Sequence, residues 1–505
     1  MTRVPLVPAA LAACFLGAPR VPAQPATPAP AAASTARLHP PAITKHAGVF
    51  NGTKVSYTAT VDETVVPNAA GRPSARIVAV AYTADAANPA TRPVVFVSNG
   101  GPIVPSIYLH VMGLGPRILS IPEDLAADTS QFNLVDNPHA VLDVADLVFF
   151  DPASTGWSRV LDGIKVEEYY TTDADAQQLA AFVDRWTREN GRTASPKYLL
   201  GESYATIRVP EAAKQLARLP EPIMLDGVFL MGQAANQLEV NTRPYNIISP
   251  AIGLPSIAAA AWYHKKVDRR GLTVFQWMDS ARAFSANEYI NALFKGISAL
   301  DDATKNRIAG RLQGLTGIPA SYFLTNNLRI TRPTFQQELF KAEGMKLGSD
   351  DARYMGPVRG PEPDAGPASM AAPVFEAYAR AELMVTRTEE FRRRQLPPST
   401  AVQGGRGNAG GGWAYAPGAS PFNDFPYTSS ITDVMTKNPK FRVYIGSGIY
   451  DMKTTTGAAD YLVAQAGWPK DRVRVSYYEG GHMAYTNPAA LKQFNADVRA
   501  MVQGK

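Results

Sequence analysis

Hydrophobic and polar positions alternate along two stretches near the start of the chain, residues 55–61 and 76–82. Strict alternation is typical of strands that bury one face. A turn sequence containing glycine and proline separates the two stretches. The pattern therefore predicts an antiparallel β-meander over residues 47–82.

A different pattern follows, in which continuous apolar runs alternate with amphipathic stretches. The apolar runs occupy residues 93–98, 146–150, 198–200 and 223–231. Such runs are typical of strands covered on both faces. Residues 172–189 predict a helix with Leu179, Phe182, Val183 and Trp186 on one side, and residues 209–218 predict another. This rhythm predicts an α/β fold: a mostly parallel central sheet with helices on both faces.

This alternation of strand and helix patterns is interrupted between about residues 236 and 439 and then resumes. Helical patterns dominate the interruption, for example at residues 281–312 and 377–394. Strand, helix, strand and helix patterns resume at residues 441–446, 458–465, 472–478 and 488–502. We therefore expect a core in two parts, residues 47–235 and 440–505, with a mainly helical cap inserted at 236–439.

The N-terminal residues predict export. Arg3 precedes an apolar stretch over residues 4–18 that is too short to span a bilayer, and Val21–Pro22–Ala23 offers a cleavage site. Residues 1–23 thus read as a signal peptide, and residues 24–46 as a Pro/Ala-rich linker. Leu11–Ala12–Ala13–Cys14 also resembles a bacterial lipobox, so lipid anchoring through Cys14 stays open beside periplasmic or extracellular secretion.

Composition narrows the functional classes. The 505 residues carry a formal net charge of +6, and no run of Lys and Arg interleaves with aromatic residues, which argues against nucleic-acid binding. Cys14 is the single cysteine, so an internal disulfide framework is excluded. No stretch after the signal peptide is apolar enough to cross a membrane. Residues 405–410 match Gly-x-Gly-x-x-Gly but follow no predicted strand. The sequence has no Gly-Lys-Ser/Thr phosphate loop and no His-Glu-x-x-His zinc motif, so neither a nucleotide cofactor nor a metal is implied.

A candidate nucleophile lies at a strand-to-helix turn. The sequence Gly201–Glu202–Ser203–Tyr204–Ala205 follows an apolar strand and precedes a helix. This is the context of a nucleophile elbow, whose tight turn needs small flanking residues and exposes the serine hydroxyl. Gly201 and Ala205 supply those flanks, so Ser203 is the predicted nucleophile.

A serine nucleophile needs a base and an orienting carboxylate. Of the six histidines, His482 directly follows a predicted strand near the C-terminus, and Asp451 follows the preceding strand. Taken singly, Asp451 could be a turn residue and His482 a loop residue. The order Ser203, Asp451, His482 is that of α/β-hydrolases. Backbone N–H groups of Tyr204 and of the glycine loop at residues 99–102 are candidates for an oxyanion hole.

Five short blocks together resemble the serine carboxypeptidase family. They are Asn99–Gly100–Gly101–Pro102, the stretch 151–158 (DPASTGWS), Gly201–Glu202–Ser203–Tyr204–Ala205, Gly448–Ile449–Tyr450–Asp451 and Gly481–His482–Met483. The resemblance implies an α/β-hydrolase fold and, with the export signal, an exported bacterial member. It implies Ser203 as nucleophile, His482 as base and Asp451 as its orienter, with N–H groups of Gly101 and Tyr204 as the oxyanion hole.

The same resemblance implies a substrate: peptides with a free C-terminus. Asn99 and Glu202 match the family residues that hold the terminal carboxylate, and Glu202 would have to be protonated, which favours acidic pH. Three positions depart from the family pattern, because Val97, Ile103 and Leu114 replace a tryptophan, a glycine and a glutamate. Hydrolysis is therefore better supported than strict carboxypeptidase action. An esterase or acyltransferase on the same triad, or a non-catalytic binding protein on the same fold, remain alternatives.

Overall fold

The computed structural model describes residues 37–85, 88–236, 245–393, 413–415 and 427–505. The predicted signal peptide with Cys14, residues 24–36 of the predicted linker and the glycine motif at 405–410 lie outside these residues. None of the helices in the described ranges is both long and apolar enough to span a bilayer.

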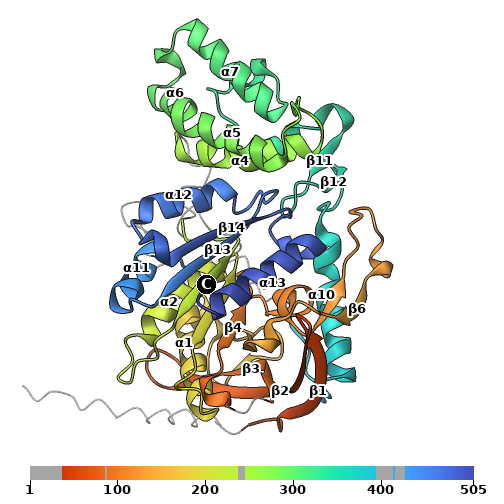
Figure 1. Cartoon of the computed structure of the whole chain (residues 1–505), viewed down its shortest axis with the longest axis vertical. Helices are drawn as coiled ribbons and strands as arrows, with labels where there is room; N and C mark the ends of the chain where they lie inside the picture. The colour runs from red at the N-terminus through yellow and green to blue at the C-terminus, as the bar shows by residue number, and fades with distance from the viewer. Residues whose placement is uncertain (1–36, 86–87, 237–244, 394–412, 416–426) are drawn as a thin grey trace, which may run out of the picture.

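A ten-stranded sheet forms the centre of the molecule (Figure 1). Its order is β1-β2-β3-β7-β4-β9-β10-β13-β14, and β8 pairs with β3. The antiparallel part comprises β1 (Ala42–Phe50), β2 (Thr53–Pro67), β3 (Pro73–Ala84), β7 (Asp146–Phe150) and β8 (Arg159–Val160). From β7 onward the neighbours are parallel: β4 (Val94–Ser98), β9 (Lys197–Glu202), β10 (Gly227–Met231), β13 (Arg442–Gly448) and β14 (Val473–Tyr478). The predicted mostly parallel sheet is confirmed.

The meander starts earlier than predicted. β1 begins at Ala42 and pairs along its whole length with β2, so residues 42–46 are strand and not linker. The sequence hides this strand because its apolar Ile43 and Val49 are exposed, while Thr44 and His46 occupy the half-buried positions. Hydrophobic periodicity therefore does not identify β1 as a strand that buries one face.

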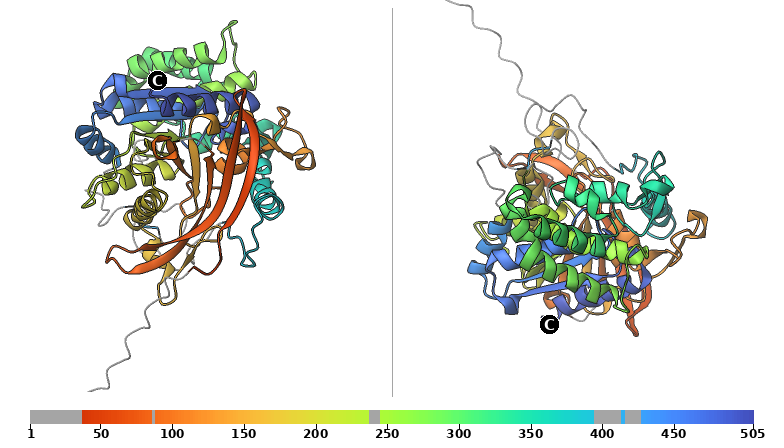
Figure 2. Two further views of the ribbon diagram at one scale, coloured as in Figure 1. Left: turned by 60° about the horizontal axis from the view of Figure 1, so that its bottom comes forward. Right: turned by 90° about the horizontal axis from the view of Figure 1, so that it is seen from above.

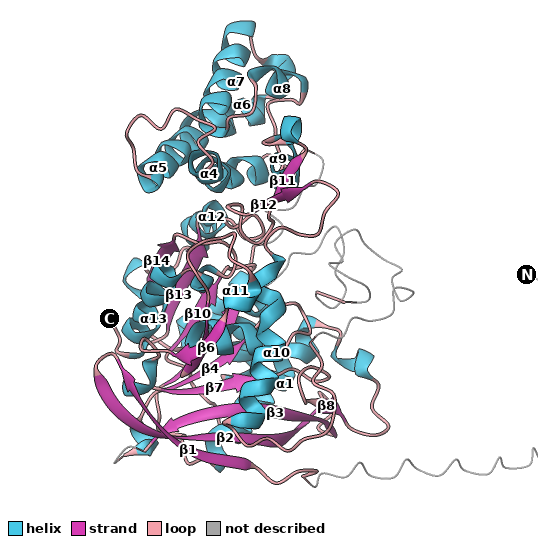
Figure 3. Cartoon of the chain, turned by 90° about the vertical axis from the view of Figure 1, so that its right-hand side faces the viewer, coloured by secondary structure: helices cyan, strands magenta, loops and turns pink. Residues whose placement is uncertain are grey.

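Helices cover both faces of the sheet, as Figure 3 shows. One apolar core joins the sheet to α1 (Thr172–Glu189), α2 (Ala205–Leu216), α11 (Tyr427–Lys437) and α12 (Thr456–Ala466). A second core, on the opposite face, joins it to the π-helix η2 (Leu109–Leu114), α10 (Ala365–Ala381) and α13 (Pro488–Val502). The carboxyl ends of the parallel strands are thus held between two packed layers.

The cap is shorter than the predicted range 236–439. A third core of its own unites α4 (Ile248–Tyr263), α5 (Val274–Phe284), α6 (Ile290–Lys295), α7 (Asp302–Thr316), α8 (Ala320–Thr325) and α9 (Arg332–Glu338). These helices lie over one end of the core (Figure 2, right). The hairpin of β11 (Met345–Leu347) and β12 (Met355–Pro357) follows. However, α10 and α11 fall inside the predicted cap and pack on the sheet instead.

Two helices predicted within the cap have different bounds in the structure. The range 281–312 is divided among α5, η6 (Ser285–Tyr289), α6, η7 (Ile297–Ala299) and α7. Gly296 at φ +78° ends α6, and the side chain of Asp301 caps α7 by accepting from Thr304 N–H, so the chain turns there. The prediction of a helix at 377–394 is wrong, because α10 ends at Ala381 and residues 382–393 are not helical.

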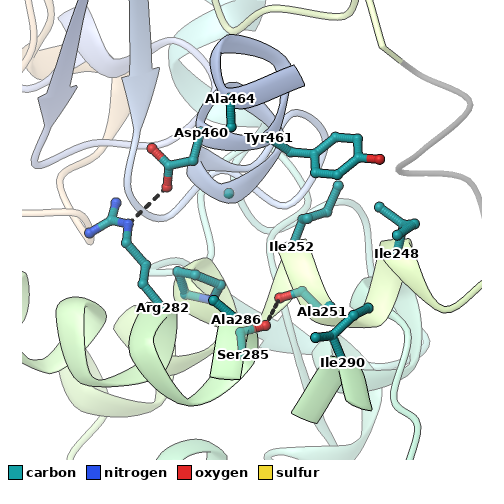
Figure 4. A pocket seen from close by; sticks show the side chains of 12 residues that line it. Ile248, Ala251, Ile252, Arg282, Ser285, Ala286, Ile290, Asp460, Tyr461 and Ala464 are labelled. Carbon is teal, nitrogen blue, oxygen red and sulfur yellow. Dashed lines mark hydrogen bonds and ion pairs between the residues drawn. The ribbon is translucent and has the colours of Figure 1, made fainter. Parts of the chain in front are cut away.

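An open pocket of about 310 Å³ lies between the cap, at α4, the end of α5, η6 and α6, and helix α12 of the core (Figure 4). Its walls are mainly apolar. The ion pair of Arg282 with Asp460, 2.8 Å, lies at its edge. The predicted catalytic residues do not line it.

Candidate active site

Ser203 lies in the turn between β9 and α2, as the sequence predicts. Its backbone has a φ of +56°, which an L-residue adopts only at a cost. The turn is fixed by Ser203 N–H, which donates to Met231 O at 2.8 Å, and by Thr206 N–H, which donates to Ser203 O at 2.9 Å. A Cβ at Gly201 would lie 2.5 Å from the Ala205 carbonyl oxygen, so this position requires glycine.

The glycine loop after β4 packs directly against this turn. A Cβ at Gly100 would lie 2.6 Å from the backbone nitrogen of Tyr204, and Gly101 has a φ of +106°. The two candidate oxyanion donors, Gly101 and Tyr204, are therefore on neighbouring segments. Arg208, which the sequence analysis did not single out, holds the loop: it donates to Asn99 O at 2.7 Å and to Asp175 at 2.6 Å.

His482 and Asp451 form a buried pair. The imidazole Nδ1 is 2.7 Å from Asp451 Oδ2. Asp451 also accepts from Lys453 N–H at 2.6 Å, from Thr454 N–H at 2.9 Å and from the Thr454 hydroxyl at 2.6 Å. The backbone N–H of His482 donates to Asp350 O at 2.6 Å. The Asp451 carboxylate is therefore held from several directions, and His482 is held through its ring and its backbone.

The electrostatics of this pair favour a positive imidazole beside a negative carboxylate. Burial disfavours a charged His482, but the charge and hydrogen bond of Asp451 outweigh it and raise the pKa of the imidazole. The charges of Asp350 and Glu202 act in the same direction. Burial likewise disfavours the Asp451 carboxylate, but His482 and the hydrogen bonds from Thr454 lower its pKa below the ordinary value.

Ser203 and His482 both approach the end of β10. The Ser203 turn is bonded to Met231, the last residue of that strand. The next residue, Gly232, has a φ of +56°, and a Cβ there would lie 3.2 Å from Cε1 and Nδ1 of His482. Because β9, β10, β13 and β14 are adjacent and parallel, their carboxyl ends bring the elbow, the acid and the histidine to one edge.

Glu202 is buried beside this group. Its Oε2 accepts hydrogen bonds from the Asn99 amide and from the Tyr485 hydroxyl, the latter at 2.6 Å. Burial raises the pKa of Glu202 to about 7, although the positive charge of His482 and the Tyr485 hydrogen bond pull it down. The structure thus brings Asn99 and Glu202 together, as predicted, and adds Tyr485.

The three departures from the family pattern are all buried. Val97 and Leu114 are fully enclosed, and Ile103 is 5% exposed. Ile103 has a φ of +60° at the position where the family has glycine, so the loop keeps a glycine-like backbone with a branched side chain. Within the described ranges, no group of three or more His, Cys, Asp and Glu side chains could hold a metal ion.

Comparison with known proteins gives a family match over part of the chain. Residues 80–284 match the model of a family described as serine carboxypeptidase. The predicted resemblance to that family is confirmed. The matched segment contains Asn99, Glu202 and Ser203, whereas Asp451 and His482 lie beyond it. No curated protein matches.

A solved structure shows the fold of this chain. KEX1(DELTA)P, a prohormone-processing carboxypeptidase from Saccharomyces cerevisiae, is similar with a TM-score of 0.51 at 12% identity, over 88% of this chain and 90% of that one. The peroxisomal α/β-hydrolase Lpx1 from the same organism matches with a TM-score of 0.33 at 8% identity, over 92% and 90% of the chains. The fold is that of the α/β-hydrolases, as predicted.

Proposed function

We propose that this chain is a serine-type carboxypeptidase, which releases C-terminal residues from peptides through a Ser203–His482–Asp451 triad and an acyl-enzyme. The observation that carries the proposal is the buried hydrogen bond of His482 to Asp451 at the sheet edge that also presents Ser203. The match of residues 80–284 to the serine carboxypeptidase family supports the same reaction class.

The proposed reaction has two steps. His482 Nε2 takes the proton of Ser203 as its Oγ attacks the scissile carbonyl carbon, and the N–H groups of Gly101 and Tyr204 stabilise the oxyanion. Collapse breaks the C–N bond, and His482 returns the proton to the leaving amine. Water then attacks the acyl-enzyme, gives its proton to His482 and releases the shortened peptide, which regenerates the Ser203 hydroxyl. Asp451 keeps Nδ1–H in place throughout.

Selection of a free C-terminus is assigned to Asn99 and Glu202. Two carboxylates in a closed site repel, so Glu202 must be protonated to bind the terminal carboxylate. With a pKa of about 7, Glu202 holds its proton at acidic pH and loses it as the pH rises through neutrality. We therefore expect KM for free C-terminal peptides to rise above about pH 7.

The test compares matched peptides that carry a free or an amidated C-terminus, together with a small ester. A carboxypeptidase cleaves the free peptide and spares the amidated one, and Ser203→Ala abolishes turnover. Equal cleavage of both peptides would refute the exopeptidase assignment.

An esterase or acyltransferase on the same triad is the second candidate, because Val97, Ile103 and Leu114 depart from the carboxypeptidase pattern. Turnover of the ester without turnover of either peptide would favour it. Failure of a fluorophosphonate to label Ser203 in folded protein would instead favour a non-catalytic binding role.

A further inference from the structure

We propose that Tyr485 is a positioning residue, whose hydroxyl holds Oε2 of Glu202 as an acceptor so that the acid proton of Glu202 lies on Oε1. This inference rests on the proposed function, in which a protonated Glu202 donates to the terminal carboxylate of a peptide.

The donor directions around Glu202 are fixed by their surroundings. The Asn99 Oδ1 accepts Leu109 N–H at 3.0 Å, which leaves the Nδ2 of that amide to donate to Glu202 Oε2. The phenol of Tyr485 has one proton, and it donates that proton to the same oxygen at 2.6 Å. Burial raises the pKa of Tyr485 well above the ordinary value of a phenol, so the hydroxyl stays protonated.

These two donors determine which oxygen of Glu202 can carry a proton. A carboxyl oxygen has two lone pairs, and both on Oε2 are used. A proton on Oε2 would displace one donor from a buried site, which is unfavourable. Within the described part of the chain, Oε1 accepts no hydrogen bond, so it is the oxygen that can carry the proton without displacing a donor.

The ring of Tyr485 is held independently of its hydroxyl. It packs on Phe494 with centroids 5.7 Å apart, and a Cβ at Gly113 would lie 3.5 Å from it. The side chain is 1% exposed. Removing the oxygen alone therefore leaves the ring in place and takes away only the donor.

The charged and titratable groups that face Glu202 come from several elements. Its pKa is affected by His482 after β14, by Asp350 before β12 and by Asp451 after β13, besides Tyr485 in η10 (Ala484–Thr486). Only Tyr485 among these can be changed without altering a formal charge. A Tyr485→Phe substitution is thus a clean probe of the hydrogen bond.

The experiment measures KM for a free C-terminal peptide from pH 4 to 9 in wild-type protein and in Tyr485→Phe. Loss of a donor to the carboxylate raises the pKa of Glu202, so the alkaline rise in KM moves upward by about one pH unit. Without the Tyr485 hydroxyl, the acid proton of Glu202 is no longer confined to Oε1. We therefore expect KM at low pH to rise as well, by about fivefold. A small ester has no terminal carboxylate, so the change in its KM should be much smaller than the change in KM for the peptide.

Tyr478→Phe is the matched control. Tyr478 is also buried, packs on Phe494 at 6.2 Å and donates to a carboxylate, Asp497, at 2.9 Å, but it does not contact Glu202. Its KM profile should follow wild type. Glu202→Gln, which cannot ionise, should lose the alkaline rise altogether.

The outcomes separate the two proposals. If wild-type protein does not prefer free over amidated peptides, the carboxypeptidase assignment fails and this inference fails with it. If wild type shows that preference and Tyr485→Phe keeps both the wild-type pH profile and the wild-type KM, the positioning role of Tyr485 is refuted while the carboxypeptidase assignment stands.

Discussion

Glu202 and His482 each change the proton affinity of the other. A negative Glu202 raises the pKa of His482, and a positive His482 lowers the pKa of Glu202. Proposed catalysis needs a neutral imidazole together with a protonated carboxyl. The pair therefore titrates as a unit, and a pH profile reports the pair and not one residue.

The first prediction uses Glu202→Gln to separate the titration of His482 from that of Glu202. Removing this carboxylate removes one of the charges that raise the pKa of His482, so the imidazole becomes neutral at lower pH. The acid limb of kcat for a small ester should move down by about one pH unit. Stopped-flow or steady-state profiles of wild type and variant measure this, and an acid limb that moves upward or not at all would contradict the coupling.

Among elements, those with a strong periodic signal were predictable and those without it were not. Helices α1 and α13 match the predicted ranges residue for residue, because each has a continuous amphipathic pattern. Strand β1 was missed because its apolar residues are exposed. Helix α10 was assigned to the cap because a sequence pattern shows that a helix has an apolar face but not which surface covers it.

The residues of the candidate site also divide into those with a local sequence signal and those without one. Ser203, Asp451 and His482 each follow a strand, which is a local signal, and their order along the chain is specific. Tyr485 reaches Glu202 across 283 positions of sequence, and Arg208 reaches Asn99 across 109. No local pattern marks such contacts, so these residues could be found only once the chain was folded.

The second prediction concerns how the segment after α10 is tied to the sheet. Arg387 pairs with Glu63 of β2 at 3.0 Å, and Arg76 of β3 lies 3.3 Å from the same carboxylate. The Glu63 side chain is fully buried. Glu63→Gln leaves two guanidinium groups without their counter-charge, so unfolding free energy should fall by about 3 kcal/mol. Urea denaturation measures the change.

Asp184→Asn provides the control for that substitution. Asp184 pairs with Arg188 one helical turn away on the surface of α1, at 2.7 Å. An exposed pair of this kind contributes only about 0.3–0.5 kcal/mol. Equal losses in the two variants would show that the buried cluster does not fasten this segment.

At the scale of the whole molecule, the cap packs against the segment that follows Asp451. Thr456 N–H, five residues after Asp451, donates to Ser256 Oγ of α4 at 3.3 Å. Gly457 then meets the backbone of Ile252 so closely that any Cβ would overlap its carbonyl oxygen. The pocket of about 310 Å³ lies in this same interface, beside α12. The contact of α4 with α12 therefore couples the position of the cap to the segment after Asp451, beside Arg332 of α9, which donates to Met452 O at 2.8 Å.

The last prediction tests this contact with Gly457→Ala. The added methyl group must push α4 away from α12, because the clash is with backbone and no side chain can yield. Unfolding free energy should fall by about 2 kcal/mol, as for other overpacked interiors. If the cap forms walls of the peptide site, kcat/KM for a peptide should fall more than kcat/KM for a small ester.

Gly310→Ala in the cap helix α7 is the matched control, since a Cβ there meets nothing within 4 Å. Replacing an open helical glycine with alanine should raise stability by about 0.5–1 kcal/mol and leave both activities unchanged. A Gly457→Ala protein that behaves like Gly310→Ala would mean that α4 can move without disturbing either the core or the acid loop. A parallel loss of peptide and ester turnover would instead place the effect on Asp451 itself, through the first turn of α12.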